Sequence, residues 1–340
     1  MKVGVLTGGG DCAGLNAVIR AVVRRAADYN YEVIGIRRGW AGLLEPDTLR
    51  LDYDMVEGAL PVGGTMLLTS RTNPFSKDGG PERVVANAKE LGLDCIVAIG
   101  GEDTLGVAQK LSSHGLKFVG VPKTIDNDLS ATDVTFGFHT AVDVAMEAID
   151  RVKSTGESHE RVMVVEVMGR GAGWIAAYSG IASGAHVILV PEEPFDMDAI
   201  CTLLQGRAKR GEKSSLVVVA EGAQPREREE AAGGGRRLDQ FGHPMLGGIG
   251  RFVAQEIERR TGLETREVVL GHLIRGGSPN AYDRVLATRF GVAAVDLVKA
   301  GKFGQMVSLR GNSVVSVDVK DALKPKLLDM SLLAVGREFQ

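Results

Sequence analysis

The sequence predicts an α/β protein built on largely parallel sheets. Short β-branched runs alternate with amphipathic helical patterns through most of the 340 residues. Most runs are continuously apolar, as expected for strands that are covered on both faces. Two of them end directly in a glycine turn that precedes a helical pattern. Ligands of such folds bind beyond the carboxyl ends of the strands, so these turns are the predicted position of a site.

The elements follow in order along the chain. Strands are predicted at Lys2–Thr7, Glu32–Arg37, Asp94–Gly100, Lys117–Val121, Val162–Val167, His186–Val190, Ser215–Ala220 and Val268–Leu273. One helix face is indicated by the spacing i, i+3, i+4, i+7, i+8 and i+11 of Leu15, Val18, Ile19, Val22, Val23 and Ala26. A second is indicated by Val142, Ala145, Met146, Ile149 and Val152. The charged, Gly-rich stretch near 223–247 interrupts this pattern and predicts a surface insertion.

Composition excludes several classes of protein. Forty Lys and Arg against 43 Asp and Glu give a net charge of −3, so no basic field favours nucleic acid. The longest uncharged stretch, 171–191, contains several Gly and Ser residues, and it predicts a helix, a turn and a short strand, not a membrane span. Three widely spaced cysteines predict a reducing, cytoplasmic location with neither disulfides nor a zinc site.

Three turns carry the candidate chemistry. Gly8-Gly9-Gly10-Asp11 follows the first strand, where backbone N–H groups and a helix N-terminus favour phosphate, although a tight structural turn would look the same. Gly100-Gly101-Glu102-Asp103-Thr104 adds two carboxylates, of which one is explained by the helix dipole and the pair suggests a polyphosphate with Mg²⁺. Pro122–Asp128 holds a cation, a hydroxyl and two carboxylates; a solvated turn is the alternative, and phosphoryl transfer is the functional interpretation.

A second group of residues suggests a pocket for a dianion. It consists of several arginines, one His and one Glu at predicted strand ends: Arg161, Met168-Gly169-Arg170, Glu221, Arg266 and the run from Gly271 to Gly277. A single Arg is most often a solvated surface residue. Several together in an acidic protein favour anion binding.

These motifs resemble the phosphofructokinase family over nearly the whole chain. The resemblance rests on TGGGDCAGLNAVIR, GGEDT, PKTIDND, MGRGAGW and GHLIRGGSPNAYDR, in that order and at similar spacing. It implies a two-lobed α/β subunit, each lobe a mainly parallel sheet flanked by helices. Residues 1–137 and about 274–323 would form the larger lobe for phosphoryl donor and Mg²⁺; 138–273 and about 324–340 would form the smaller, sugar-phosphate lobe. It also implies a cytoplasmic homodimer or homotetramer with active sites shared between subunits.

The resemblance also implies a role for individual residues. Asp126 would be the general base, with Asp128 in support, and Glu102 the magnesium ligand. Lys123, Asp103, Thr124 and Arg170 would complete the catalytic set, and Gly9, Gly10, Arg71, Gly101 and Thr104 would hold the donor. Thr124 and Ile125 would border the transferred phosphoryl group. The sugar would be contacted by Met168, Gly169, Arg170, Glu221, Leu273 and Ile274, where Gln is common in the family. Arg161, Arg266, His272 and Arg275 would clamp its 6-phosphate, the first two from a neighbouring subunit.

Two departures bear on the donor. Where ATP-using members commonly carry Gly, this chain has Asp103 and Lys123, which resembles the pyrophosphate-using members. The expectation is therefore pyrophosphate-dependent phosphorylation of fructose 6-phosphate to fructose 1,6-bisphosphate. An ATP-dependent phosphofructokinase is the first alternative, and a catalytically silent sugar-phosphate-binding regulator the second. In addition, Gly184-Ala185-His186 lacks the carboxylate that ATP-using bacterial relatives use to bind a nucleotide effector, which predicts weak or absent activation by ADP.

Overall fold

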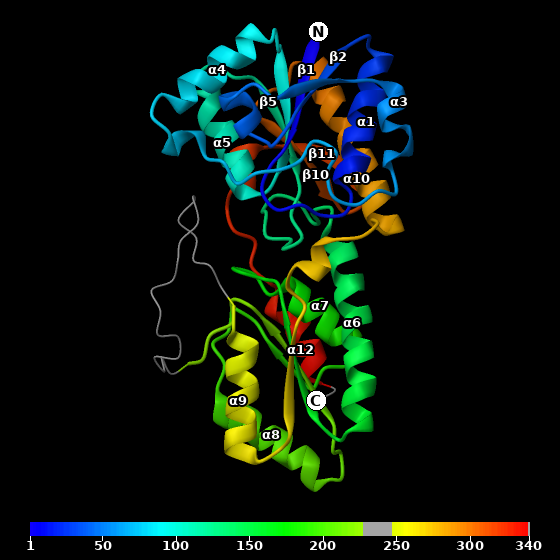
Figure 1. Ribbon diagram of the computed structural model, residues 1–340, viewed down its shortest axis with the longest axis vertical. Helices are drawn as coiled ribbons and strands as arrows, with labels where there is room; N and C mark the ends of the chain where they lie inside the picture. The colour runs from blue at the N-terminus through cyan, green and yellow to red at the C-terminus, as the bar shows by residue number, and fades with distance from the viewer. Residues whose placement is uncertain (227–246, 339–340) are drawn as a thin grey trace. The chain divides into compact units, whose positions relative to one another are not determined.

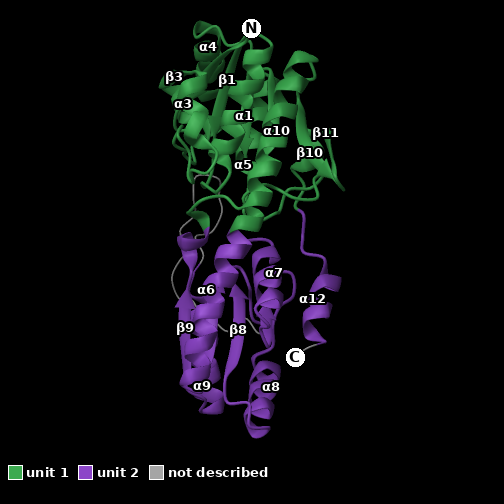
Figure 2. Ribbon diagram, turned by 90° about the vertical axis from the view of Figure 1, so that its right-hand side faces the viewer, with its two compact units in different colours: residues 1–140, 240–243, 275–325 green, residues 141–239, 244–274, 326–340 purple. Residues whose placement is uncertain are grey.

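The computed structural model describes residues 1–226 and 247–338, which form two compact units (Figure 1). Unit 1 comprises residues 1–140 and 275–325, shown in green in Figure 2. Unit 2, in purple, comprises 141–226, 247–274 and 326–338 of the described residues. Almost all of the insertion predicted at 223–247 lies outside the described residues.

Unit 1 is built on a sheet in the order β11-β10-β5-β4-β1-β2-β3. Its strands are β1 (Lys2–Thr7), β2 (Glu32–Ile36), β3 (Thr48–Leu51), β4 (Cys95–Gly100), β5 (Phe118–Pro122), β10 (Gln305–Arg310) and β11 (Ser313–Asp318). The two outer strands, β3 and β11, are antiparallel to their neighbours, and the other pairings are parallel. The predicted α/β class with a mainly parallel sheet is confirmed.

Helices cover this sheet. Those of unit 1 are α1 (Leu15–Asp28), α2 (Ala41–Leu44), α3 (Tyr53–Val56), α4 (Gly80–Glu90), α5 (Glu102–Ser112), α10 (Ala281–Lys299) and α11 (Val319–Ala322), with short 3-10 turns at Glu57–Ala59 and Pro74–Ser76. The apolar face predicted for α1 is buried, which confirms that helix. It packs closely on α10, since a Cβ added at Gly291 would lie 2.6 Å from the Cβ of Ala21.

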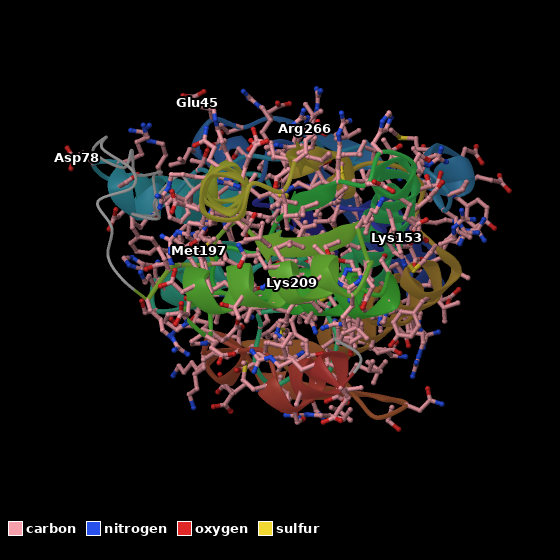
Figure 3. All side chains as sticks on the ribbon, turned by 90° about the horizontal axis from the view of Figure 1, so that it is seen from below. Glu45, Asp78, Lys153, Met197, Lys209 and Arg266 are labelled. Carbon is pink, nitrogen blue, oxygen red and sulfur yellow. The ribbon has the colours of Figure 1, made fainter. Side chains whose placement is uncertain are left out.

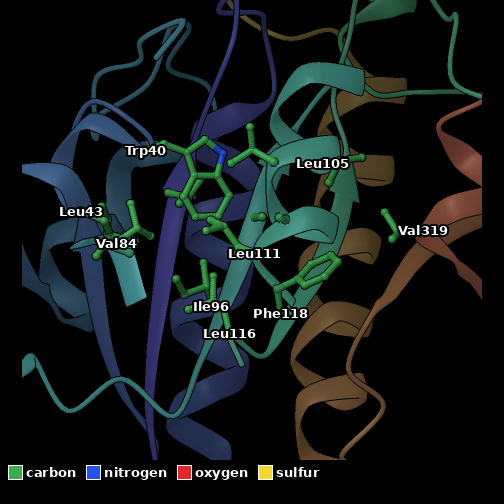
Figure 4. Close-up of a cluster of buried hydrophobic side chains, with 14 of the residues drawn as sticks. Trp40, Leu43, Val84, Ile96, Leu105, Leu111, Leu116, Phe118 and Val319 are labelled. Atoms are coloured by element: carbon green, nitrogen blue, oxygen red, sulfur yellow. The ribbon is translucent and has the colours of Figure 1, made fainter. Parts of the chain in front are cut away.

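The core on the α5 side of the sheet is shown in Figure 4. Trp40, Ile96, Leu105 and Phe118 are each no more than 2% exposed, and they bring together β4, β5, α5 and the turn after β2. The indole Nε1 of Trp40 donates a hydrogen bond to the Thr104 carbonyl at 3.3 Å. Large apolar side chains contribute several kcal/mol each when buried, so this cluster fixes the first turn of α5 against the sheet.

The strand order determines where a ligand can bind to unit 1. From β1 the chain proceeds to β2 on one side, and it later places β4 and β5 on the other side. The crevice outside the carboxyl ends of strands at such a reversal is the usual ligand site of open α/β sheets. The three candidate turns follow β1, β4 and β5, which are adjacent and parallel, and therefore lie at one edge.

Unit 2 is built on a smaller parallel sheet in the order β7-β8-β6-β9. Its strands are β6 (Val162–Val167), β7 (Val187–Leu189), β8 (Ser215–Ala220) and β9 (Thr265–Val269). The strand predicted at Val268–Leu273 is displaced, because the strand begins at Thr265 and residues Gly271–Arg275 form a 3-10 turn, η3. The apolar run was misleading because β9 is an edge strand whose Arg266 and Glu267 are exposed.

The helices of unit 2 are α6 (Phe138–Ser158), whose first three residues belong to unit 1, α7 (Trp174–Ala182), α8 (Met197–Lys209), α9 (Ile249–Thr261) and α12 (Met330–Arg337). Met197 and Lys209 mark the two ends of α8 in Figure 3. The uncharged stretch 171–191 forms α7, a turn and β7, as predicted. Within the described ranges, none of the helices has the length and apolar character needed to cross a membrane.

Candidate active site

The first glycine turn is held to the loop that carries Arg71. The N–H of Gly9 donates to the Ser70 carbonyl at 3.1 Å, and the Thr69 hydroxyl donates to the Gly9 carbonyl at 2.6 Å. Gly9 has φ 78°, in the left-handed region that favours glycine. These two bonds hold the backbone of the loop just before Arg71 against the turn.

The second glycine turn meets the first through Thr104. The Thr104 side chain is 3% exposed and lies against the backbone of both Gly8 and Gly100. A Cβ at Gly8 would come within 2.8 Å of the Thr104 Cγ2 atom, and one at Gly100 within 2.6 Å. Thr104 therefore fixes the separation of the two turns from within the protein.

The two carboxylates of this second turn lie at the N-terminus of α5. Gly101 is the N-cap, and Glu102, which is exposed, and Asp103, which is half-buried, occupy the first helical turn. The positive end of the helix dipole stabilises acidic side chains there by about 0.3–1 kcal/mol each. This accounts for their placement at the helix start. It leaves their carboxylate oxygens at the ligand-binding edge of the sheet.

Lys123 follows β5 and crosses to the first turn. The residue is 3% exposed, and its ammonium group donates a hydrogen bond to the Gly10 carbonyl, while its backbone N–H donates to the Gly100 carbonyl at 3.0 Å. Burial lowers the pKa of Lys123, and the nearby Arg275 guanidinium acts in the same direction. A buried cation thus stands directly behind the glycine turn.

The turn from Thr124 to Asp128 is fixed by its own side chains. The Thr124 hydroxyl accepts from the Asp126 N–H at 3.1 Å, and the Thr124 carbonyl accepts from the Thr135 hydroxyl at 2.7 Å. Asn127 has φ 51°, and its side-chain oxygen accepts from the Thr135 N–H at 3.2 Å. Ile125 is 1% exposed, so its side chain anchors the turn, and only its backbone can face a ligand.

The two carboxylates of that turn act on one another. Burial is the main cause that raises the pKa of Asp128 to about 7, and the negative charge of Asp126 adds to it. The negative charge of Glu102 also raises the pKa of Asp128, so the Glu102 carboxylate is close enough to act on this turn. One acid that is protonated near neutral pH beside another carboxylate is an arrangement suited to proton transfer.

A magnesium ion suits the oxygen ligands at this edge. Among the residues described, no three His, Cys, Asp or Glu side chains are grouped as a ready-made metal site. Mg²⁺ is commonly held by one or two carboxylates together with substrate phosphates. Glu102 and Asp103, beside two phosphate-type turns, are therefore residues that fit it.

In unit 2, the turns after β6 and β8 lie together. The Glu221 N–H donates to the Val167 carbonyl at 2.9 Å, and the Gly222 N–H donates to the Gly169 carbonyl at 3.1 Å. Gly169 has φ 145°, and a Cβ there would lie 2.9 Å from the Ala172 carbonyl oxygen. Met168, Gly169, Arg170 and Glu221 are thereby brought to one end of the sheet, as expected for sugar-binding residues.

Arg161 and Arg266 lie at the opposite end of that sheet. Glu264 joins them, with its carboxylate 2.8 Å from the Arg161 guanidinium and 2.6 Å from that of Arg266, which is labelled in Figure 3. Arg161 and Met168 flank the six residues of β6, so seven steps of about 3.3 Å, or roughly 23 Å, separate them. Within one chain, these two arginines therefore do not reach the end that holds Met168.

The last predicted group spans η3. His272 is exposed and the Leu273 side chain is 61% exposed, but that of Ile274 is 1% exposed and is packed inside. Arg275 belongs to unit 1, where its Nη1 donates to the Asp11 carbonyl at 3.2 Å. The structure thus places Arg275 on the first glycine turn.

Sequence reasoning missed two residues that shape the site. Thr135 holds the Thr124–Asp128 turn, as described above. Asp283 is 0% exposed and accepts from the Gly137 N–H at 2.9 Å, the Thr140 N–H at 2.7 Å and the Thr140 hydroxyl at 2.6 Å. An acidic residue three positions after the cap residue Asn280 is typical of a helix N-terminus, so the sequence could have indicated this position. The partners of its side chain could not be predicted in this way, because they lie over 140 residues away in the sequence.

Comparison with known proteins agrees with this geometry. The phosphofructokinase family model matches residues 2–298. A pyrophosphate–fructose 6-phosphate 1-phosphotransferase of Streptomyces coelicolor is 56% identical over 95% of this chain and 94% of its own length. An ATP-dependent 6-phosphofructokinase 3 of the same organism is 54% identical over 95% of both. A crystal structure of a pyrophosphate-dependent phosphofructokinase from Marinobacter aquaeolei has a TM-score of 0.82 at 26% identity, covering 97% of this chain and 86% of that one.

The fold, the two phosphate-type turns and these matches define a sugar-phosphate kinase, a transferase. The chain belongs to the phosphofructokinase family. Relatives named for different phosphoryl donors are almost equally similar, so overall identity does not distinguish between the donors. That question turns on individual residues.

Proposed function

We propose that this enzyme transfers a phosphoryl group from pyrophosphate to the 1-hydroxyl of fructose 6-phosphate, with Mg²⁺ as cofactor. The observation that carries the choice of donor is the buried Lys123 ammonium against Gly10, next to the helix turn that carries Asp103. Pyrophosphate is small and highly charged, so a fixed cation near the turn stabilises it during transfer. The relative with 56% identity is named for this reaction.

Asp103 supports the same choice. In ATP-using members the resembling position is commonly Gly, which leaves room for an α-phosphate, whereas a carboxylate fills and charges that space. Two like charges about 4 Å apart repel by roughly 4 kcal/mol at an effective dielectric constant near 20. At about 1.4 kcal/mol per decade, that repulsion is roughly a thousandfold discrimination against ATP.

The chain's own residues supply the proton transfer and the charge stabilisation. The sugar O1 forms a bond to one phosphorus of pyrophosphate, and the bridging P–O bond breaks with its electron pair leaving on orthophosphate. Asp126 accepts the proton of the hydroxyl. Lys123 and Thr124 would hold the transferred phosphoryl group, and Asp128 would support Asp126. Glu102 would hold Mg²⁺, which would supply neutralisation of the phosphate charge.

The acceptor site draws on unit 2 and on a second subunit. Met168, Gly169, Arg170 and Glu221 would hold the sugar. Arg161 and Arg266 lie at the far end of the sheet from them, which supports a role in the phosphate clamp of a neighbouring subunit. We therefore propose a homodimer or homotetramer with shared active sites. The three cysteines are all free and buried, which supports a cytoplasmic location.

Steady-state kinetics tests the choice of donor. Initial rates are measured at fixed fructose 6-phosphate and Mg²⁺ while either pyrophosphate or ATP is varied. The proposal expects the higher kcat/KM with pyrophosphate; a higher value with ATP would establish the ATP-dependent alternative, which the relative at 54% identity favours. Sugar-phosphate binding without turnover by any donor would instead indicate a silent regulator.

A further inference from the structure

The turn that carries Asp126 is backed by a short buried segment, residues 135–137, which follows it along the chain. The Thr135 hydroxyl donates to the Thr124 carbonyl at 2.7 Å, and the Thr135 N–H donates to the Asn127 side-chain oxygen at 3.2 Å. Thr124 and Asn127 lie on either side of Asp126 in the sequence. The two bonds therefore hold the turn both before and after the proposed base.

The same segment contacts the chain just after the first glycine turn. The Phe136 carbonyl accepts a hydrogen bond from the Cys12 thiol at 3.8 Å. A Cβ added at Gly14 would lie 2.8 Å from the Phe136 ring, and one added at Gly137 would lie 2.5 Å from the Cys12 Sγ atom. Glycine at both positions permits this close approach. Residues 135–137 thus join the two turns.

Two further contacts hold the segment in place. The backbone of Phe136 pairs with that of Lys123 in an isolated parallel β-bridge. The Gly137 N–H donates at 2.9 Å to the buried carboxylate of Asp283, which also accepts from the Thr140 N–H at 2.7 Å. All the residues in this arrangement belong to unit 1, so it forms within one compact unit.

The spacing of the two turns matters for the proposed transfer. The donor would lie at the first glycine turn, and Asp126 has to reach the sugar hydroxyl that attacks it. Reacting atoms must come within about 3–3.5 Å of one another, and a displacement of about 1 Å can lower the rate by about a hundredfold. Closely packed interiors transmit such displacements instead of absorbing them. A buried segment between the turns can therefore determine the rate.

We propose that residues 135–137 set the position of Asp126 relative to the donor turn, with Thr135 as a positioning residue. Thr135 is 0% exposed and its hydroxyl is bonded to the Thr124 carbonyl, so it acts through the turn and not on a substrate. The proposal rests on the proposed roles of Asp126 and the first glycine turn. It holds for pyrophosphate and for ATP alike.

Steady-state kinetics of two Thr135 variants tests the proposal. Thr135→Val keeps the volume and removes the hydroxyl that donates to Thr124. We expect kcat to fall at least tenfold, while the KM values for pyrophosphate and fructose 6-phosphate stay within twofold of the wild type. Thr135→Ser keeps the hydroxyl and should have a kcat within threefold of the wild type. Thr288→Val is the matched control with an unchanged kcat, because the Thr288 hydroxyl donates to the Arg284 carbonyl at 2.8 Å within α10.

A double-mutant cycle separates positioning from a general loss of structure. The base is already absent in Asp126→Asn, so adding Thr135→Val to it should lower kcat by less than a further twofold. A further tenfold loss in that background would overturn the proposal. So would a kcat of Thr135→Val within twofold of the wild type, or a loss that Thr135→Ser does not restore.

Melting temperatures show whether Thr135→Val is folded. If it is not, Asn127→Gly takes its place in the cycle, because it removes the other bond and glycine readily adopts the φ of 51° found there. Should the wild type prefer ATP, the proposed donor fails by itself, and the same variants are compared with ATP. The failure of the positioning role is thereby distinguished from that of the donor.

Discussion

The Thr104 side chain occupies the space that a Cβ atom at Gly8 would need, with the Thr104 Cγ2 only 2.8 Å from that position. Gly8 follows β1 and Thr104 lies in the first turn of α5, which also carries Glu102 and Asp103. The contact therefore links the donor turn to the helix that bears the candidate metal ligand. A disturbance at Gly8 should reach both.

Gly8→Ala should consequently impair stability and catalysis together. The added methyl group must displace Thr104, and overpacking of this kind typically costs about 1–3 kcal/mol. Urea unfolding should show that loss, and kcat should fall as α5 shifts. Gly106→Ala is the control, because a Cβ there meets nothing within 4 Å and Ala favours a helix by about 0.5–1 kcal/mol. Equal behaviour of the two variants would contradict the contact.

The fold class and the turns that carry the site were predictable because both are local patterns. Continuous apolar runs such as Val162–Val167 indicate parallel strands wherever they occur. Three strands of unit 1 were not predicted, namely the antiparallel edge strands β3 and β11 and their neighbour β10 in the sheet interior. The edge strand β9 was displaced, because it carries exposed charges in place of an apolar run. The contacts of Thr104, Thr135 and Asp283 join segments that are far apart in sequence or in different elements, which no periodicity reports. Arg275 was identified as an anion-binding residue, but the turn it contacts follows from tertiary structure alone.

Asp126→Asn should lower kcat by at least about a hundredfold, a typical contribution of general base catalysis. The amide is nearly the same size but accepts no proton from the sugar hydroxyl. Binding of fructose 6-phosphate, followed by titration without donor, should stay within a few-fold of the wild type. Asp54→Asn, at an exposed site on α3, controls for the lost charge. A kcat near that of the wild type would exclude Asp126 as the base.

Asp128 should make stability fall as pH rises towards neutrality. Its pKa is about 7 when folded and about 3.8 in its ordinary state, so the folded protein binds the extra proton between these values. The stabilising effect of that proton is complete below pH 3.8 and is lost through pH 7. Asp128→Asn lacks this dependence. The free energy of unfolding in urea is measured for both proteins at pH 5 and pH 8. Relative to the wild type, the variant should be more stable at pH 8 than at pH 5. A difference between the two proteins that is the same at both pH values would contradict the assignment.

His186 should have the opposite effect to Asp128, because it should make the protein less stable as the pH falls. Its Nδ1 accepts the Leu216 N–H at 2.9 Å, and burial lowers its pKa to about 4, with Arg207 and Lys153 adding to the effect. The contribution of neutral His186 to the free energy of unfolding is therefore fully present above pH 6.5, and it is lost as the pH drops towards 4. His186→Gln should lose less stability than the wild type between pH 7.5 and pH 5, by about 1 kcal/mol because solvent screens the partly exposed ring. Identical losses would show that His186 does not titrate in this way.

The imidazole of His186 is thus committed to a backbone hydrogen bond, at the position where ATP-using bacterial relatives would supply an effector-binding carboxylate. We expect ADP to leave the fructose 6-phosphate saturation curve unchanged. An ADP-dependent shift of that curve would show that other residues provide an effector site.

Asp103→Gly should open the donor site to ATP. Removing the carboxylate frees the space next to the glycine turns and abolishes the repulsion of an α-phosphate, so the KM for ATP should fall and kcat/KM with ATP should rise. Pyrophosphate turnover should decline, because the loop loses a fixed group around the smaller donor. Asp103→Asn is the matched control: it keeps the volume and removes the charge, and it separates the steric contribution from the electrostatic one.

Lys123→Gly should differ, since it removes the cation on the Gly10 carbonyl without clearing the space beside α5. It should mainly reduce pyrophosphate turnover. The two residues follow adjacent strands, so the double variant should depart from the sum of the single effects by about 0.5–3 kcal/mol. The ratio of kcat/KM for ATP to that for pyrophosphate is measured in all four enzymes. If Asp103→Gly leaves this ratio unchanged, neither volume nor charge at Asp103 selects the donor.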